Sequence, residues 1–223
     1  MLEKMSDFFE NRLDGYDEHM RTNVDDEGEF YAFTAAQLPK TAGAKILDLG
    51  CGTGLELEDY FALNPAAEIT GIDLCRPMLD ALEKKFPEKK LRLICASYFD
   101  EPIEKEYFDG AVSVESLHHF TKAQKMPLYK KLCDGLKKGA SFILTDYFAD
   151  HQEREDYFQR ELIRLKQEQG IEDDAFYHYD TPLTLENETG ALLDAGFSRV
   201  TVLKNWGATY TIRAETYGER HAV

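Results

Sequence analysis

Cysteine and long apolar runs are both scarce in this sequence of 223 residues. The four cysteines, Cys51, Cys75, Cys95 and Cys133, form no CxxC pair and have no histidine at metal-ligand spacing, which argues against zinc and fits reduced thiols. No run approaches the ~18 to 20 apolar residues of a membrane span. The N-terminal segment is acidic and amphipathic, unlike a secretory signal. We therefore predict a cytoplasmic protein without disulfides, a metal site or a membrane partner.

Basic residues are also few. The chain has 26 lysines and arginines against 42 aspartates and glutamates, which gives a formal net charge of −16. A negative field of this size repels a polyphosphate, so DNA and RNA are disfavoured partners. The charge therefore favours a small-molecule ligand, and it is compatible with either a monomer or a homodimer.

Apolar residues make up 43% of the chain, so one domain spanning 1–223 can bury a core. Strand-like apolar runs occur at 44–49, 68–74, 91–96, 108–114 and 140–148, and amphipathic segments lie between them. One of these segments predicts a helix over Leu128–Lys138, with Gly139 as its C-cap. Near-continuous apolar strands that alternate with helices indicate a parallel sheet covered on both faces. Residues 44–147 are thus predicted to form a ligand-binding core.

The segments outside this core do not continue the alternation of strands and helices. Residues 1–40 are predicted to form a helical cap on the ligand side of the sheet, and 148–182 a substrate-side insertion with a long helix. A closing helix begins near Thr184, and two apolar runs at 198–206 and 209–215 are separated by only two residues, which is a hairpin connection. The segment 184–214 therefore closes the sheet. The predicted fold class is α/β, a doubly wound Rossmann-like, mostly parallel seven-stranded sheet with a C-terminal antiparallel hairpin.

The run ILDLGCGTG, residues 46–54, indicates a ligand-binding loop. A strand ends near Asp48, and Gly50, Gly52 and Gly54 follow in a turn that opens a helix. Glycine is needed where the backbone approaches a ligand or takes a positive φ. The spacing is GxGxG, whereas a dinucleotide fingerprint is GxGxxG. A carboxylate at Asp48 repels a diphosphate but attracts the α-ammonium of an amino acid, so the motif favours a ligand with a cationic end; the alternative is that Asp48 caps the following helix.

A second acid, Asp73, ends the next strand in GIDL. Its two oxygens can each accept one hydroxyl of a ribose. NAD-binding folds share this feature, so Asp73 indicates a nucleoside more than it indicates a particular donor. The alternative is an N-cap for the helix entered through Arg76 and Pro77. The specific pattern is the pair of acids that flanks GxGxG.

On these residues, the segment 44–147 resembles the cofactor half of class I S-adenosylmethionine-dependent methyltransferases, and 184–214 is similar to their closing helix and hairpin. The resemblance implies S-adenosyl-L-methionine as cofactor and S-adenosyl-L-homocysteine as product. It implies that the glycine loop holds the methionine moiety, the second acid the ribose, and the end of the third strand the adenine. The cofactor-binding residues implied in this way are Tyr16, Asp48, Gly50, Cys51, Gly52, Thr53, Gly54, Asp73, Leu74, Met78, Ala96, Ser97, Tyr98 and Glu115.

The residues after the fourth strand, VESLHHF, place His118 and His119 where an acceptor should approach the methyl group. An imidazole titrating near ~6.5 is the natural base for a phenol, amine or thiol. His119 is the preferred catalytic candidate and His118 the second. The alternative is that both histidines pack or cap the next helix.

The resemblance implies transfer of a methyl group to an unidentified small-molecule acceptor by in-line displacement. Three alternatives stay open. One is other chemistry on the same cofactor, such as a carboxymethyl-donor synthase, whose extra substrate acid would need a cation such as Arg199 or Arg213. Another is an NAD-linked oxidoreductase, against which the GxGxG spacing and Asp48 speak. The last is a cofactor-binding protein without turnover.

Overall fold

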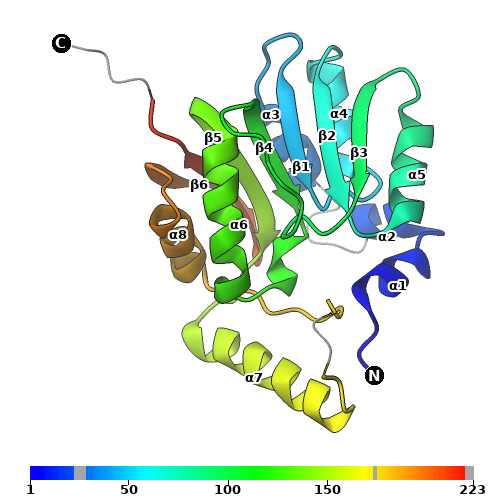
Figure 1. Ribbon diagram of the computed structural model, residues 1–223, viewed down its shortest axis with the longest axis vertical. Coiled ribbons are helices and arrows are strands. Elements are labelled where there is room, and N and C mark those ends of the chain that lie inside the picture. The colour runs from blue at the N-terminus through cyan, green and yellow to red at the C-terminus, as the bar shows by residue number, and fades with distance from the viewer. Residues whose placement is uncertain (23–28, 173–174, 219–223) are drawn as a thin grey trace.

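The computed structural model describes residues 1–22, 29–172 and 175–218. Its helices are α1 (Met5–Glu10), α2 (Tyr16–Thr22), α3 (Glu29–Gln37), α4 (Leu55–Leu63), α5 (Arg76–Lys85), the 3₁₀ turn η2 (Leu117–His119), α6 (Lys122–Gly135), α7 (Gln152–Glu168) and α8 (Leu185–Asp194). Its strands are β1 (Lys45–Leu49), β2 (Glu68–Asp73), β3 (Lys90–Cys95), β4 (Phe108–Val114), β5 (Leu136–Tyr147), β6 (Arg199–Trp206) and β7 (Thr209–Glu215). Figure 1 shows their arrangement.

The seven strands form one sheet in the order β3-β2-β1-β4-β5-β7-β6. Strands β1 to β5 are parallel, and β7 pairs antiparallel with both β5 and β6. The predicted doubly wound sheet with a C-terminal antiparallel hairpin is confirmed. The chain winds outward from β1 to β3 and then returns to β4 beside β1, so the winding reverses between these two strands. Ligands of such folds bind outside the carboxyl ends of the strands at this reversal.

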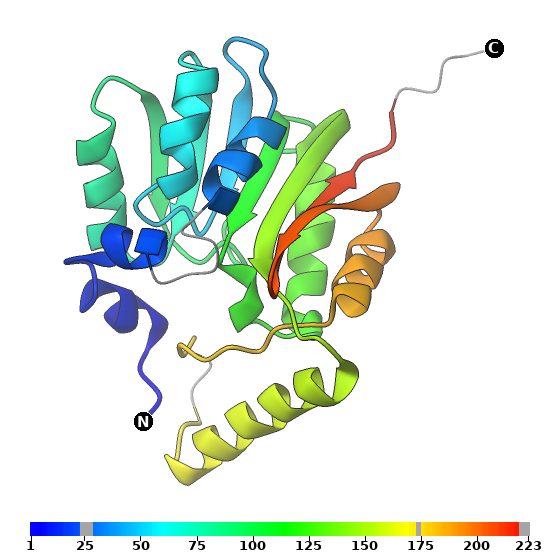
Figure 2. The ribbon, with the colours of Figure 1, turned by 180° about the vertical axis from the view of Figure 1, so that it is seen from behind.

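Helices cover both faces of the sheet (Figure 2). On one face α3, α4 and α5 surround a buried cluster that includes Phe30, Leu57 and Leu82. On the other face α6 and α8 bury Leu132 and Leu192 against the sheet. Because both faces are covered, the central strands β1 and β4 are buried along nearly their whole length, which explains their almost continuous apolar sequence.

The helix predicted over Leu128–Lys138 is misplaced. α6 begins six residues earlier, at Lys122, because Thr121 and the third residue of the helix form a reciprocal capping box. It ends at Gly135, because Leu136 already has an extended backbone with φ −79° and ψ 141° and pairs with β4. The strand therefore starts where the sequence predicted the last turn of a helix.

The N-terminal helices occupy two different places. α3 packs against α4 and β5, so it belongs to the layer on the face of the sheet. α1 and α2 instead lie toward the ligand edge, where Met5 and Phe9 of α1 pack with residues from the ends of the strands. Of the helices described within residues 1–22 and 29–40, α1 and α2 lie at the ligand edge and α3 does not.

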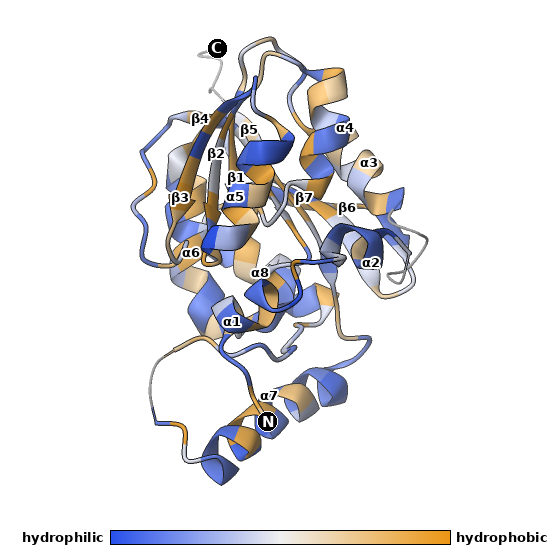
Figure 3. Ribbon diagram, turned by 90° about the vertical axis from the view of Figure 1, so that its right-hand side faces the viewer, coloured by the Kyte–Doolittle hydropathy of each residue, from blue (hydrophilic) through white to orange (hydrophobic). Residues whose placement is uncertain are grey.

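α7 projects from the body of the molecule, as Figures 1 and 2 show. Figure 3 shows that it is mostly hydrophilic, in contrast to the strands. Its buried residue is Glu155, whose Oε2 accepts hydrogen bonds from the Thr184 N–H at 2.6 Å and from Nδ2 of Asn187 at 2.8 Å. The negative charge of Glu155 also interacts favourably with the positive end of the α8 helix dipole. Glu155 therefore fixes the N-terminal part of α7 to α8.

The structure bears on the cysteines and on the length of apolar helices. All four cysteines are free thiols. None of the helices in the described part of the chain combines the length and the apolar character needed to span a bilayer.

Candidate active site

The glycine loop after β1 meets the loop after β4 at the reversal of the sheet. Gly50 has a φ of +73°, and a Cβ at this position would overlap the side chain of Ser116. Gly54, with φ +72°, is the N-cap of α4 and would press a Cβ against Leu57 and Leu82. Both positions need glycine for conformation and for space. The loop therefore brings bare backbone to the edge of the sheet.

Asp73 ties the end of β2 to this loop. Its Oδ2 accepts a hydrogen bond from the Gly52 N–H at 2.9 Å, and its Oδ1 accepts one from the Cys75 N–H at 2.8 Å. Burial raises the pKa of Asp73, although the backbone N–H groups oppose this shift. Each oxygen keeps lone-pair capacity for a further donor. Asp73 can therefore hold the loop and still receive hydroxyl groups from a ligand.

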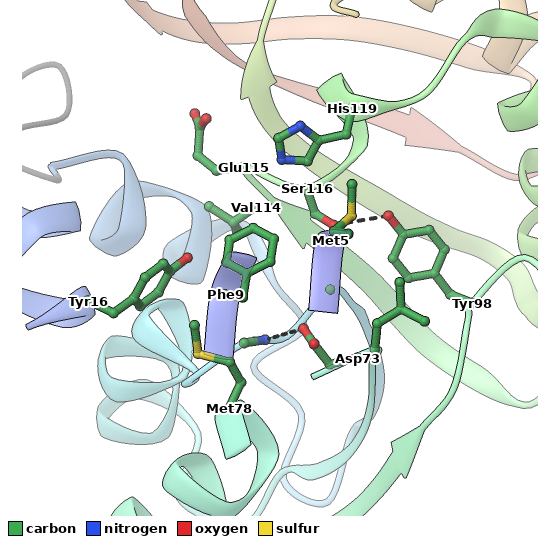
Figure 4. Close-up of a pocket in the computed structure, with 13 residues that line it drawn as sticks. Met5, Phe9, Tyr16, Asp73, Met78, Tyr98, Val114, Glu115, Ser116 and His119 are labelled. Atoms are coloured by element: carbon green, nitrogen blue, oxygen red, sulfur yellow. Dashed lines mark hydrogen bonds between the residues drawn. The ribbon is translucent and has the colours of Figure 1, made fainter. Parts of the chain in front are cut away.

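These residues line a narrow cavity of about 50 Å³, which we call the donor cavity (Figure 4). Nine of the predicted residues line it: Tyr16, Gly50, Gly52, Asp73, Leu74, Met78, Tyr98, Glu115 and His119. Three others were not predicted from the sequence: Met5, Phe9 and Val114. Ser116, which the sequence places at the rim with Glu115 and His119, also lines it. Ser116 lies within the quoted VESLHHF run, and its Oγ is 3.1 Å from the hydroxyl of Tyr98.

Met5 and Phe9 extend from α1 across the donor cavity, as Figure 4 shows. Pockets that hold ligands of this kind measure roughly 300–1,000 Å³, far more than the space left here. A nucleoside-sized ligand therefore does not fit unless the side chains of Met5 and Phe9 move. The only sequence signal for these two residues was the apolar side of a short amphipathic helix.

Asp48 lies beneath the glycine loop and does not line the donor cavity. Its side chain is buried beside Glu56 of α4, and neither Asp48 Oδ2 nor Glu56 Oε1 has a hydrogen-bond partner among the described residues. Burial, and next the charge of Glu56, raise the pKa of Asp48 well above its usual range. Burial also raises the pKa of Glu56. Burial and the neighbouring carboxyl therefore favour the protonated form over the charged form of this pair.

The remaining predicted residues lie around the donor cavity rather than in its wall. Thr53 Oγ1 donates to Asp17 of α2 at 2.5 Å, and Cys51 packs against Gly71 of β2. Ala96 and Ser97 form the turn after β3, in which Ser97 Oγ accepts from the N–H of Phe99. These residues belong to the loops after β1 and β3, and other residues near these loops line the donor cavity.

A second, larger cavity of about 640 Å³ adjoins the first, and we call it the acceptor cavity. Its lining comes from α1, α2, the loop after β4 and the segment before α8: Phe8, Phe9, Asn11, Arg12, Asp14, Gly15, Tyr16, His19, Met20, Glu115, His118, His119, His178 and Asp180. Phe9, Tyr16, Glu115 and His119 line both cavities. Both histidines predicted as catalytic therefore line the acceptor cavity, and His119 lines the donor cavity as well.

The two histidines have opposite electrostatic surroundings. Nδ1 of His118 is 2.5 Å from Oδ1 of Asp146. Burial alone would lower the pKa of His118, but Asp146 and then Glu115 raise it to about 9. Burial lowers the pKa of His119 to about 4, and the neighbouring His118 adds to this effect. At neutral pH, His118 is protonated and His119 is neutral, so neither titrates near the free value assumed from the sequence.

Glu115 completes this group at the end of β4. It has a φ of 47°, which is uncommon for a residue with a Cβ and is typical of functional sites. Its Oε1 accepts a hydrogen bond from Thr209 Oγ1 at 3.1 Å. Burial, and next the charge of Asp146, raise the pKa of Glu115 to about 8.

The cationic partners suggested for an acidic substrate lie elsewhere. Arg199 pairs with Glu215, and Arg213 donates to Oε1 of Gln37 at 2.8 Å. Neither lines the cavities. Among the described residues, the guanidinium that does so belongs to Arg12, which stacks over Phe8 and pairs with Glu3 at 3.2 Å.

Comparison with known proteins agrees with this geometry. Residues 46–139, which contain the glycine loop and β2 to β4, match the family model of a methyltransferase domain. This match identifies residues 46–139 as a methyltransferase domain. The strand order and the glycine loop are similar to those of class I S-adenosylmethionine-dependent methyltransferases, whose cofactor is S-adenosylmethionine.

Particular relatives are diverse. The chain is 26% identical over 211 residues to the carboxy-S-adenosyl-L-methionine synthase of Helicobacter hepaticus, which covers 90% of this chain and 85% of that protein. It is 28% identical over 119 residues to the O-methyltransferase cnsE of Penicillium expansum, covering 52% and 42%. A putative O-methyltransferase from Nostoc punctiforme has a similar structure, with a TM-score of 0.65 at 20% identity over 84% of this chain and 56% of that one. The matches to several curated relatives span less than half of those proteins.

Proposed function

We propose that this chain transfers the methyl group of S-adenosylmethionine to a small-molecule acceptor bound in the acceptor cavity. The observation that carries the proposal is the wall shared by the two cavities. A donor on the glycine loop and an acceptor in the larger chamber would meet at Phe9, Tyr16, Glu115 and His119.

The reaction is an in-line displacement at a sulfonium. The acceptor atom donates a lone pair to the methyl carbon, and the carbon–sulfur bond breaks with its electrons passing to sulfur, which leaves as a neutral thioether. Positioning the two atoms roughly 3–3.5 Å apart supplies much of the rate. The chain's task is therefore to fix two ligands against each other and exclude water, with α1 as the element that covers them.

His119 is the proposed catalytic residue of this reaction. Its low pKa leaves the ring unprotonated at neutral pH, with a lone pair available toward an acceptor. His118 carries the positive charge and is oriented by Asp146, so it is placed to stabilise negative charge on an acceptor. The acidic balance of the whole chain supports a small acceptor over a nucleic acid.

The same cofactor chemistry in a carboxymethyl-donor synthase is the second candidate. It is favoured by the Helicobacter hepaticus relative, whose match extends over most of both chains. That chemistry needs a cation for the extra carboxylate. Arg12 is already paired with Glu3 and stacked on Phe8. The charge on His118 is already countered by Asp146 at 2.5 Å, so the site favours methyl transfer.

Two measurements test the proposal. Isothermal titration should show binding of S-adenosylhomocysteine and none of NAD. Incubation with S-adenosylmethionine and a small-molecule extract should then give S-adenosylhomocysteine together with a product heavier by one methyl group. Absence of S-adenosylhomocysteine binding would overturn the function. Binding without any turnover would indicate a cofactor-binding protein, and a product carrying a carboxymethyl sulfonium would indicate the second candidate.

A further inference from the structure

Three side chains converge at the wall of the acceptor cavity although they come from segments about sixty residues apart. Oδ1 of Asp180 lies 3.2 Å from Nδ1 of His119 and 3.6 Å from Nε2 of His118. All three atoms lie within 4.8 Å of one another. Bonds of about 2.0–2.2 Å from a metal ion to tetrahedral ligands place the ligand atoms about 3.3–3.6 Å apart. The two separations that involve Asp180 are close to this spacing.

His118 is oriented in the way that metal-binding histidines are. Its Nδ1 is occupied by Asp146 Oδ1 at 2.5 Å, and the other carboxylate oxygen of Asp146 accepts from the Leu117 N–H at 2.8 Å. Fixing Nδ1 in this way leaves Nε2 directed toward His119 and Asp180. A carboxylate behind the distal nitrogen is the usual outer-shell partner of a ligating imidazole.

His119 supplies a second, independent indication. Its side chain is only 4% exposed. Despite the short distance to Asp180, its Nδ1 has no partner with hydrogen-bond geometry among the described residues. Leaving a buried polar nitrogen unsatisfied is unfavourable, and native structures rarely do so without a ligand, water or ion.

We propose that Nε2 of His118, Nδ1 of His119 and Oδ1 of Asp180 bind one divalent transition-metal ion of the Zn²⁺ type. Binding releases the proton that Nε2 of His118 carries in the metal-free chain. In the metal-bound chain the ion therefore takes the place of the charge on His118 and of the base at His119. Two imidazoles and one carboxylate are a donor set suited to such ions. Because the three residues line the acceptor cavity, the remaining coordination position faces that cavity. The carboxylates of Asp146 and Asp180 add negative charge that favours a cation.

The ion would act on the acceptor, and this part rests on the proposed function. An acceptor bound through oxygen, nitrogen or sulfur would lose its proton to solvent more readily, because the cation stabilises the resulting anion. The anion's lone pair would then form the bond to the methyl carbon as the carbon–sulfur bond breaks. The sequence missed this arrangement because Asp180 is distant from the histidines along the chain, so no ligand spacing is recognisable.

Titration of the full, EDTA-treated chain with Zn²⁺, and with Co²⁺ monitored by visible absorption, tests the site. We expect one equivalent of tightly bound ion and a Co²⁺ spectrum of low coordination number. Asp180→Ala should weaken binding at least about tenfold, and it should fold normally because the Asp180 side chain is 43% exposed. His119→Asn should have the same effect. His151→Asn, which removes an exposed histidine paired with Asp150 at 2.7 Å, is the matched control and should bind normally.

Failure of this proposal is distinguishable from failure of the proposed function. S-adenosylhomocysteine is titrated into the same EDTA-treated protein, because the donor cavity does not require the ion. Normal S-adenosylhomocysteine binding without Zn²⁺ binding would overturn the metal site alone and identify the cluster as an ion-pair network around a protonated His118. Equal Zn²⁺ affinity in Asp180→Ala, His119→Asn and the parent chain would also overturn it, since the ion would then bind elsewhere.

Discussion

A Cβ on Gly50 would lie 2.1 Å from Oγ of Ser116, so the loops after β1 and β4 are in contact across the reversal of the sheet. This contact brings the backbone of the glycine loop next to the residues that follow β4. It also makes the space between the two loops sensitive to a single methyl group.

Gly50→Ala should therefore lower the free energy of unfolding by about 2–5 kcal/mol, combining the left-handed backbone and the overlap, and should abolish S-adenosylhomocysteine binding. In the double variant with Ser116→Gly, the stability lost through steric overlap should be recovered. The stability lost through the positive φ at residue 50 should not be. The control is Gly190→Ala in α8, where a Cβ meets nothing within 4 Å and the helix should gain roughly 0.8–1 kcal/mol. Chemical denaturation measures all three. A Gly50→Ala chain as stable as its parent would show that the loops are not in contact.

Asp73→Ala should weaken S-adenosylhomocysteine binding about 100-fold or more. Two hydrogen bonds from a charged carboxylate to a ribose contribute roughly 1.5–3 kcal/mol each, and the loop loses its anchor at the Gly52 N–H as well. Isothermal titration measures the loss. Asp80→Ala on the exposed side of α5 is the control and should bind like the parent. Unchanged affinity in Asp73→Ala would remove this residue from the donor site.

Glu56→Gln should stabilise the chain increasingly as the pH rises from 5 to 8. The pKa of both Asp48 and Glu56 is raised in the folded state, so their favourable contribution is complete below the unfolded values and is lost as the pH rises through the folded ones. An amide removes one titrating group and can donate to the unpartnered Asp48 Oδ2.

A change of one in the pKa of a group on folding corresponds to about 1.4 kcal/mol of stability. Unfolding at several pH values measures the change, with Glu83→Gln, on the exposed side of α5, as the control substitution. A stabilisation by Glu56→Gln that does not vary with pH would mean that the two carboxyls do not share a proton.

Met5→Ala should tighten S-adenosylhomocysteine binding severalfold. In this structure the Met5 side chain extends across the donor cavity, which has about 50 Å³ left, so a ligand must displace it. Leu63→Ala, which shortens a side chain that is 47% exposed, is the control. Weaker binding by Met5→Ala would instead mean that α1 packs onto the bound donor.

His119→Asn should lower turnover about tenfold or more while leaving S-adenosylhomocysteine affinity within about threefold of the parent value. Asparagine keeps a polar group of similar size near Nδ1 but provides no imidazole toward the acceptor. Turnover is followed through S-adenosylhomocysteine formation once an acceptor is known, with His151→Asn as control. Full activity would mean that positioning alone carries the reaction and that the histidine is structural.

Much of the fold could be predicted because its signals are local. Each strand is recognisable as a short apolar run. The spacing of Gly50, Gly52 and Gly54 after β1 distinguishes the loop from a dinucleotide motif without reference to distant residues. The two-residue connection between β6 and β7 likewise encodes the antiparallel hairpin. The boundary between α6 and β5 was wrong because residues near Leu136 favour helix locally, whereas pairing with β4 decides their conformation.

The sequence by itself determined the class of fold, the glycine loop and the acid at the end of β2, because periodicity and glycine spacing act over a few neighbouring residues. Only the tertiary structure decided which distant side chains share one space. It placed Glu56 beside Asp48, Met5 across the donor cavity and Asp180 against the two histidines. Those contacts depend on where helices and loops pack after the sheet has formed, and the pKa values and ligand geometry follow from that packing.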